Sequence, residues 1–119
     1  MPPLKFLPRQ RLAHARQYQA VYAGKVQRTR AGLGLTGIPN DVGFTRLGLS
    51  VGKRLGNAAQ RNRAKRLLRE AFRLSQHELP PGLDLIATVR GGRDLDLATC
   101  RAALVEMAAS IAREWERRS

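Results

Sequence analysis

The segment from Gly56 to Arg73 constrains the fold more than any other part of the chain. Its apolar residues recur at spacings of three and four, which is the period of a helix with one buried face. They are Ala64, Leu67, Leu68, Ala71 and Phe72. Asn57, followed three residues later by Gln60, matches a capping box and predicts where the helix starts. We therefore expect a helix that packs one face onto the rest of the fold.

The same segment is strongly basic. Between positions 61 and 73 it holds six Lys or Arg residues and one acid, Glu70. The helical pattern places opposite the apolar stripe Asn62, Lys65, Arg66, Arg69 and Arg73, with Arg61 and Arg63 at its two edges. A helix that needs only solubility usually alternates charges to gain pairs four residues apart. We therefore expect this face to bind phosphate groups rather than to be merely solvated, and the helix dipole favours the same anionic partner.

Charge is distributed unevenly over the 119 residues, whose formal net charge is +13. Residues 1–73 hold sixteen Lys or Arg and two acids, whereas residues 74–119 hold six Lys or Arg and seven acids. A basic half beside a nearly neutral half predicts one side that binds nucleic acid. The hydrophobic content of 43% is enough for one modest core, so we expect a single domain over residues 1–119.

Several other classes of function have no support in the sequence. The single cysteine, Cys100, excludes an intramolecular disulfide and a cysteine metal cluster, and its apolar helical position predicts burial. We find no catalytic His, Asp and Ser grouping, no nucleotide-binding loop and no metal-ligand spacing. We therefore expect no protein-bound metal and no small-molecule substrate. No apolar run approaches the roughly 18 residues of a membrane helix, and the N-terminus does not resemble a secretory signal. We expect a cytoplasmic protein with no membrane partner.

The remaining pattern predicts a small α/β sandwich with the order α-β-β-β-α-β-α. Residues 1–10 are rich in proline and should form an irregular arm, and residues 13–23 should form a short helix. Strands are expected at residues 31–38, 44–51 and 83–90. The pattern does not define the residues of the remaining strand.

Asp94 or Asp96 should cap the last helix. Its apolar face repeats at spacings of three and four, through Leu97, Cys100, Leu104, Met107, Ile111 and Trp115. We expect this helix and the basic helix to cover one face of the sheet. The binding surface should then lie on the other face and on the basic helix.

Two further stretches leave alternatives open. Tyr18 and Tyr22, four residues apart on the first helix, either pack on the sheet or stack on unpaired bases. Strand 44–51 should turn Leu47, Leu49 and Val51 to the core and the alternate residues, including Ser50, to the other face. The segment 52–56 holds Lys53 and Arg54 between two glycines. It is either a plain turn or a loop that presents backbone amides and two cations to phosphate.

Residues 46–72 resemble the signature of the bacterial ribonuclease P protein subunit family. The family's Arg-Asn-Arg motif stands here as Arg61-Asn62-Arg63. The Gly-Leu-Ser-Val element at residues 48–51 and the Gly-Asn-Ala element at residues 56–58 also match. The first helix, the later strand and the last helix agree in order and spacing. The resemblance therefore extends over nearly all of the chain.

The resemblance implies a fold and a function. The fold is a two-layer α+β sandwich with a left-handed β-α-β crossover, similar to a domain of a ribosomal protein, whereas general rules favour a right-handed one. The function is to bind the catalytic RNA of ribonuclease P. That RNA, using Mg²⁺ which it holds itself, removes the 5′ leader from precursor tRNA. The protein assists by docking on the catalytic RNA and by holding the single-stranded leader.

The resemblance also implies two groups of site residues. The helix set should dock on the catalytic RNA and consists of Arg61, Asn62, Arg63, Lys65, Arg66 and Arg69. The cleft set should hold the leader between the first helix and the sheet and consists of Tyr18, Tyr22, Ser50, Lys53, Arg54 and Arg90. The chain departs from the family at Leu35, where an aromatic is frequent, and at Gly91, where lysine is common. Both departures should weaken the leader cleft more than the basic helix.

Two other classes of function remain open. A structural RNA binder of the ribosomal-protein type would bind its RNA without altering any cleavage. A DNA-binding protein would insert the basic helix into a major groove, usually from a dimer, and the sequence has no coiled-coil seam to support one.

Overall fold

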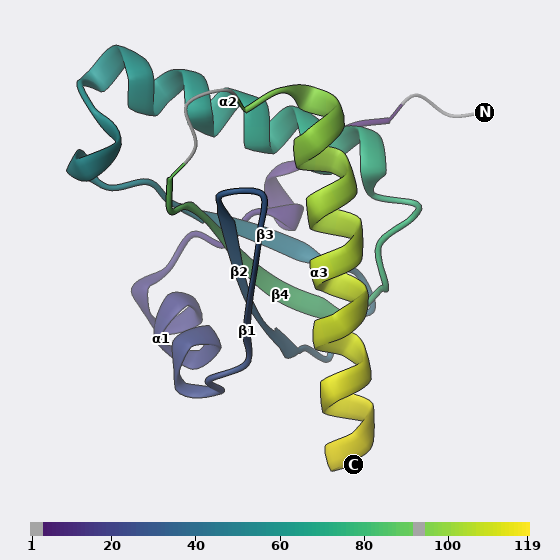
Figure 1. The fold of residues 1–119 in the computed structure, drawn as a ribbon. Helices are drawn as coiled ribbons and strands as arrows, with labels where there is room; N and C mark the ends of the chain where they lie inside the picture. Colours follow the sequence, from purple (N-terminus) through teal and green to yellow (C-terminus); the bar gives the residue numbers. More distant parts are fainter. Residues whose placement is uncertain (1–3, 92–94) are drawn as a thin grey trace.

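The computed structural model describes residues 4–91 and 95–119, which are arranged around one four-stranded sheet (Figure 1). The elements in chain order are η1 (Pro8–Gln10), α1 (Ala15–Ala23), β1 (Gln27–Arg30), β2 (Leu33–Pro39), β3 (Arg46–Ser50), η2 (Lys53–Leu55), α2 (Ala58–Ser75), β4 (Leu83–Val89) and α3 (Leu97–Arg118). This order confirms the α-β-β-β-α-β-α arrangement expected from the sequence. None of the helices in the described ranges is long and apolar enough to cross a membrane.

Strand β1 is the one whose residues the sequence did not define. It reads Gln-Arg-Thr-Arg, lies mostly exposed at the edge of the sheet and pairs antiparallel with β2. A strand with no apolar residue shows no alternation of burial, so the period-two signal is missing. The turn that follows uses Ala31 and Gly32, both with positive φ, as a type I′ hairpin requires.

The sheet order is β1-β2-β4-β3. Strand β4 pairs antiparallel with β2 and parallel with β3, and α2 connects the two parallel strands. The connection is therefore a β-α-β crossover between neighbouring strands. The left-handed sense that the resemblance implies stays a prediction.

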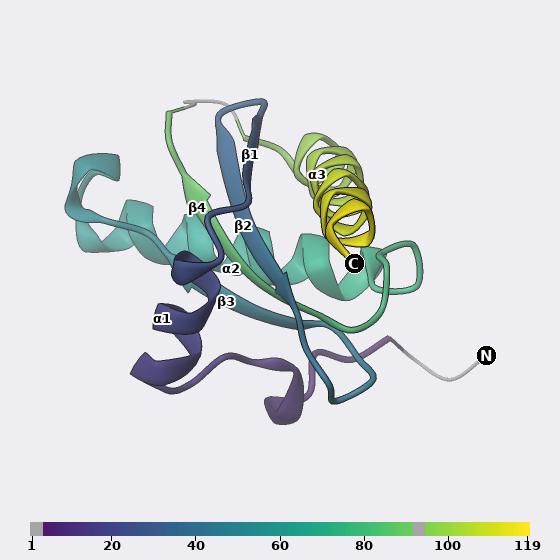
Figure 2. The ribbon, with the colours of Figure 1, turned by 90° about the horizontal axis from the view of Figure 1, so that it is seen from below.

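The helices lie on opposite faces of the sheet, as Figure 2 shows, with α1 on one side and both α2 and α3 on the other. The larger core cluster joins the sheet to the buried stripes of α2 and α3, and includes Leu68, Phe72, Leu104 and Ile111. A smaller cluster under α1 consists of Leu12, Val21 and Ile86, with Tyr18 and Ile38 packed against it. The expected placement of the basic and last helices on one face is thus confirmed.

Both long helices begin where the sequence predicts. In α2, the Asn57 side chain accepts a hydrogen bond from the Gln60 amide, and the Gln60 side chain accepts one from the Asn57 amide. Gly56 precedes this box with φ near +143°. Few other residues tolerate that conformation, and a side chain there would collide with Gln60. Asp96 caps α3 by accepting from the Thr99 amide, whereas Asp94 lies outside the described residues.

The apolar stripe of α3 also matches the expectation. Cys100, Leu104, Met107 and Ile111 are buried, and burial raises the pKa of the Cys100 thiol. Leu97 and Trp115 are partly buried at the two ends of the stripe. The Trp115 indole donates a hydrogen bond of 2.9 Å to the Gly37 carbonyl, which ties the last turns of α3 to β2.

A buried ion pair joins the two parallel strands. The Asp84 carboxylate, at the start of β4, accepts hydrogen bonds from Arg46 Nε at 2.7 Å and Arg46 Nη2 at 2.8 Å. Asn40 Nδ2 donates a third at 2.9 Å. Asp84 is 5% exposed, and its hydrogen bond raises the pKa of Arg46 above the ordinary value. The pair thus fixes the register in which Arg46 stands beside Asp84.

We predict that Asp84→Ala lowers the free energy of unfolding by about 3 kcal/mol or more, because removing one partner leaves the Arg46 charge uncompensated inside the fold. Urea unfolding measures this change. The matched control is Glu106→Ala, which breaks the ion pair with Arg30, where both side chains are about half exposed. It should change stability little. Equal effects of the two variants would contradict the structural role of Asp84.

Candidate nucleic-acid interface

The cations of α2 occupy three sides of the helix rather than one face. Lys65 and Arg69 were expected opposite the apolar stripe, and this expectation is wrong. Both are half-buried and line a pocket at the β3 edge that also includes Tyr18 and Gly48. At about 100° per residue, the row formed by Arg61, Lys65 and Arg69 lies directly beside the buried row of Ala64, Leu68 and Phe72. Packing of the buried row therefore brings Lys65 and Arg69 of this row against β3.

The other members of the helix set point elsewhere. Asn62 and Arg66 are exposed on the side that faces away from the sheet. Arg63 lies on the remaining side and lines a second pocket, together with Arg54 and Arg90 of the cleft set. The structure therefore brings Arg63 of the helix set close to Arg54 and Arg90 of the cleft set, just as it brings Lys65 and Arg69 close to Tyr18. The helix set does not form one continuous surface.

The face of the sheet under α1 carries small side chains. The strand register aligns Gly34, Thr88 and Ser50 in one row across β2, β4 and β3, and Thr36, Ile86 and Gly48 in the next. Ile86 packs with Val21 of α1, which identifies this face. Arg90 lies beyond the end of β4, and its Nε would be 3.0 Å from a Cβ atom at Gly34. Ser50 and Arg90 of the cleft set thus lie along the same row of small and polar residues, which would be the floor of the expected cleft.

Tyr18 and Tyr22 have different environments. The Tyr18 hydroxyl accepts a hydrogen bond from the Leu49 amide at 3.0 Å and donates one to the Leu49 carbonyl at 3.2 Å. It lies so close to Gly48 that a side chain there would collide with the phenol. Tyr18 therefore packs on the sheet and satisfies the backbone of β3. Tyr22 is 48% exposed, which leaves its ring accessible to a partner.

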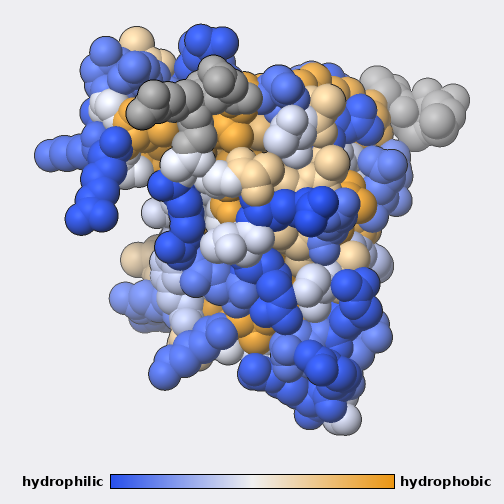
Figure 3. Space-filling view, in the orientation of Figure 1, coloured by the Kyte–Doolittle hydropathy of each residue, from blue (hydrophilic) through white to orange (hydrophobic). Residues whose placement is uncertain are grey.

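Lys53 and Arg54 stand on η2, between β3 and α2, and both are exposed. The amides of Leu55 and Gly56 donate to Gly52 and Lys53 carbonyls, so these two amides are used inside the turn. The two side chains rather than these amides can meet an anion. Hydrophilic side chains project from the molecule around η2 and the start of α2 (Figure 3). In Figures 1 and 2 this region extends beyond the sheet.

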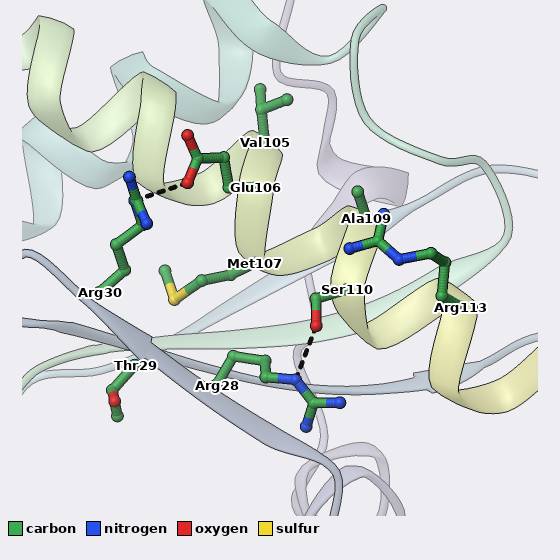
Figure 4. A pocket seen from close by; sticks show the side chains of 9 residues that line it. All are labelled: Arg28, Thr29, Arg30, Val105, Glu106, Met107, Ala109, Ser110 and Arg113. Atoms are coloured by element: carbon green, nitrogen blue, oxygen red, sulfur yellow. Dashed lines mark hydrogen bonds and ion pairs between the residues drawn. The ribbon is translucent and has the colours of Figure 1, made fainter.

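Acidic side chains pair with arginines on the surface between β1 and α3. On this surface, Arg28 donates to Ser110 and Arg30 pairs with Glu106 (Figure 4). Arg28 also pairs with Glu114. Arg117 and Arg118 also pair with Glu114, and the hydrogen bond from Arg118 is the main reason that the pKa of Glu114 is lowered. This surface is therefore largely compensated.

The surface formed by α2 and η2 is different. Glu70 pairs with Arg73, whose hydrogen bond lowers the Glu70 pKa. Within residues 4–91 and 95–119, no ion pair reaches Arg61, Arg63, Lys65, Arg66 or Arg69. The same holds in this part of the chain for Lys53, Arg54 and Arg90. Uncompensated cations at this density create a positive potential that attracts phosphate groups.

Leu35 does not belong to the cleft. Its side chain is fully buried in the core cluster on the side of α2 and α3. Because side chains alternate along a strand, the neighbours Gly34 and Thr36 face α1 instead. The expectation that Leu35 weakens the leader cleft is therefore wrong. Gly91 does lie near the cleft, where its amide donates to the Gly32 carbonyl.

No group of three or more His, Cys, Asp or Glu side chains comes together as a metal site in the described part of the chain. Glu70, the acid of α2, is held by Arg73.

Sequence reasoning missed one contributor to the pocket beside Lys65 and Arg69. Phe6 and Arg11 of the N-terminal segment also line it. Residues 1–10, which were expected to form an irregular arm, contain the short helix η1, and the Lys5 carbonyl accepts a hydrogen bond from Gln76 at the end of α2. This stretch has no apolar periodicity, so no local pattern indicated its position.

Comparison with known proteins adds independent information. A family model described as Ribonuclease P matches residues 6–112. The ribonuclease P protein component of Photorhabdus laumondii is 39% identical over 93 residues, which are 77% of this chain and 77% of that protein.

Two solved structures are also similar. The RNase P protein of Staphylococcus aureus has a TM-score of 0.71 at 26% identity, over 87% of this chain and 95% of that one. The RNase P protein of Thermotoga maritima has a TM-score of 0.73 at 24% identity, over 84% of this chain and 96% of that one. At the latter identity the similarity is one of fold.

We predict that Tyr18→Phe lowers the free energy of unfolding by about 1 kcal/mol, because it removes both hydrogen bonds to the Leu49 backbone. Tyr22→Phe is the matched control at an exposed position and should leave stability unchanged. Chemical unfolding of the two variants and the wild type provides the comparison. A Tyr18→Phe protein as stable as the wild type would show that the hydroxyl contributes nothing to the β3 edge.

Proposed function

Because the chain belongs to the ribonuclease P protein family, we propose that it docks on the catalytic RNA of ribonuclease P and holds the 5′ leader of precursor tRNA. Protein components of ribonuclease P act in tRNA processing as parts of a ribonucleoprotein, so RNA is a partner of this chain. The observation that carries the finer proposal is the uncompensated basic surface of α2 beside a cleft with a small, polar floor.

Docking on the catalytic RNA is assigned to the helix set. Its five cations make no ion pair within the described residues, so their charges are available to phosphates. Neutralising phosphates releases counterions from the RNA, which makes affinity depend steeply on salt. Arginine forks also match the geometry of phosphate oxygens. Asn62, exposed between Arg61 and Arg63, adds an amide that can donate and accept hydrogen bonds.

Holding the leader is assigned to the cleft set. In the row of Gly34, Thr88 and Ser50, the Arg90 side chain covers Gly34 at one end and Ser50 is exposed at the other, so both side chains can contact an extended strand laid along the row. Tyr22 offers an exposed ring on which a base of the leader can stack. The cations of Arg90, Lys53 and Arg54 can pair with phosphates of the leader. Aromatic stacking combined with a cationic groove is the usual way in which proteins hold single-stranded nucleic acid. Tyr18 holds α1 against β3 through its hydrogen bonds to Leu49, and we do not assign it a stacking role.

In this proposal the chemistry belongs to the RNA. Mg²⁺ bound by the RNA supplies the metal chemistry of hydrolysis, and this chain binds and orients the two RNAs. The cytoplasm, where precursor tRNA is found in bacteria, is the proposed location.

The experiment that tests this function measures cleavage of precursor tRNA at low Mg²⁺. The samples are the protein alone, a bacterial ribonuclease P RNA alone, and both together. We expect cleavage at the mature 5′ end only with both, because the protein's cations reduce the need for Mg²⁺ at the RNA phosphates.

Other outcomes separate the rival functions. Cleavage by the protein alone would place an active site in this chain. Tight RNA binding without stimulation would favour a structural RNA binder. Preference for duplex DNA over both RNAs would favour a DNA-binding protein.

We predict that Tyr22→Ala weakens the affinity of the assembled ribonucleoprotein for precursor tRNA with a leader by about tenfold, because stacking on an aromatic ring is worth about 1–3 kcal/mol per base. Affinity for mature tRNA and for the catalytic RNA should not change. Binding titrations with the three RNAs measure this. Tyr22→Phe is the control that keeps the ring. A uniform loss across all three RNAs would remove Tyr22 from the leader site.

A further inference from the structure

The N-terminal segment 4–12 is docked on the body of the protein. The Leu4 carbonyl accepts a hydrogen bond of 3.0 Å from Arg73, and the Lys5 carbonyl accepts one of 2.8 Å from Gln76. The Phe6 ring packs on the Phe72 ring of α2, with 5.1 Å between the ring centroids. Three successive residues are thus held along the C-terminal half of α2. This part of the segment is attached to the same helix that carries the basic surface.

The other end of the segment joins the sheet. The Leu12 amide donates a hydrogen bond of 3.0 Å to the Leu47 carbonyl, and Arg11 forms a parallel bridge with Leu47. The Gln10 side chain also donates to the side chain of Gln76, the residue that follows α2. The segment therefore crosses from α2 to the outer edge of β3 and is fixed at both ends. Two residues further along β3, the Leu49 amide and carbonyl are hydrogen-bonded by the Tyr18 hydroxyl instead.

This path brings Arg11 to the cationic row of α2. Its guanidinium lies over the Phe6 ring, 4.7 Å from the centroid. Arg11, Lys65 and Arg69 line one pocket, whose other lining residues are Phe6, Leu12, Tyr18, Leu47, Gly48 and Leu49. None of these lining residues is acidic. The stack on Phe6 orders a long side chain that would otherwise be free to rotate.

We propose that Arg11, Lys65 and Arg69 bind a backbone phosphate of RNA in this pocket, so that segment 4–12 is a fixed part of the RNA interface. This inference rests on the proposed function and adds to it a residue outside both the helix set and the cleft set. Three cations around one pocket repel one another unless an anion lies between them. The pocket offers that anion an ordered arginine fork and two further positive charges, already assembled before RNA arrives.

The phosphate can come from either of two RNAs. Lys65 and Arg69 belong to the helix that is proposed to dock on the catalytic RNA. Tyr18 and Gly48, on the opposite side of the pocket, border the proposed leader cleft. The chemistry of recognition is the same in both cases. The test therefore includes separate measurements with each RNA.

The main variant is Arg11→Gln, which removes the charge but keeps much of the side chain. Affinity for the ribonuclease P RNA, and affinity of the assembled complex for precursor tRNA, are measured across a series of salt concentrations. One of these affinities should fall several-fold, with a salt slope smaller by about 0.7–0.9, the value of one phosphate contact. Arg11→Lys should restore most of the slope. Arg9→Gln is the matched control, because its guanidinium lies over Phe44, 5.6 Å from the centroid, and does not line the pocket.

A double-mutant cycle tests whether the pocket acts as a unit. The double variant Arg11→Gln and Lys65→Gln should lose less affinity than the product of the two single fold-changes, because both side chains contact the same phosphate. Arg11→Gln and Arg66→Gln should combine independently, because Arg66 lies on the exposed side of α2. Independent effects in both cycles would overturn the shared site. Unfolding curves of the single variants verify that segment 4–12 remains docked.

The outcomes separate this inference from the function on which it rests. A wild-type protein that binds neither RNA would overturn the proposed function. Wild-type binding with an Arg11→Gln protein that matches it in affinity and salt slope would overturn the phosphate pocket alone. A loss confined to the catalytic RNA assigns the phosphate to that RNA. A loss confined to precursor tRNA with a leader assigns it to the leader.

Discussion

Burial of the apolar stripe of α2 is the constraint on which the rest of the structure depends. Once Leu68, Ala71 and Phe72 are packed against the sheet and α3, the direction of every other side chain on the helix is determined. Lys65 and Arg69 are brought against β3, Arg63 is brought towards Arg90, and Arg66 faces away. Burial of this one apolar stripe thus determines which of three sides of the helix each cation occupies. The same helix connects two parallel strands, so the core and the basic surface cannot form separately.

Electrostatic compensation divides the surface into two regions. The acids of α3 neutralise Arg28 and Arg30 of β1, and Asp84 neutralises Arg46 inside the fold. On α2, Glu70 is held by Arg73 in the last turns, away from the Arg-Asn-Arg motif. Around the start of α2 and η2, by contrast, no ion pair within the described residues reaches Lys53, Arg54, Arg61 or Arg63. Long-range attraction of an RNA phosphate backbone would be directed to that region.

The two faces of the sheet differ in their side chains, and the glycines of β2 and β3 make part of the face under α1 shallow. Leu33, Leu35, Leu85 and Ala87 fill the face under α2 and α3, whereas Gly34, Gly48 and Thr88 lie on the face under α1. Small residues on that face allow Tyr18 to reach the β3 backbone and hold α1 in place. The same helix carries Tyr22, whose ring is exposed.

The sequence by itself determined the element order, the capping box of α2, the core stripes of α2 and α3, and the concentration of charge, because each depends on residues close together in the chain. It did not locate β1, whose Gln-Arg-Thr-Arg run shows no alternation. It also misplaced Lys65, Arg69 and Leu35. Only the tertiary structure decided which side of α2 each cation faces, which tyrosine is held by the backbone, and where Arg11 lies. These outcomes depend on contacts between residues far apart in the sequence, such as Phe6 with Phe72 and Tyr18 with Leu49, and no local period encodes them.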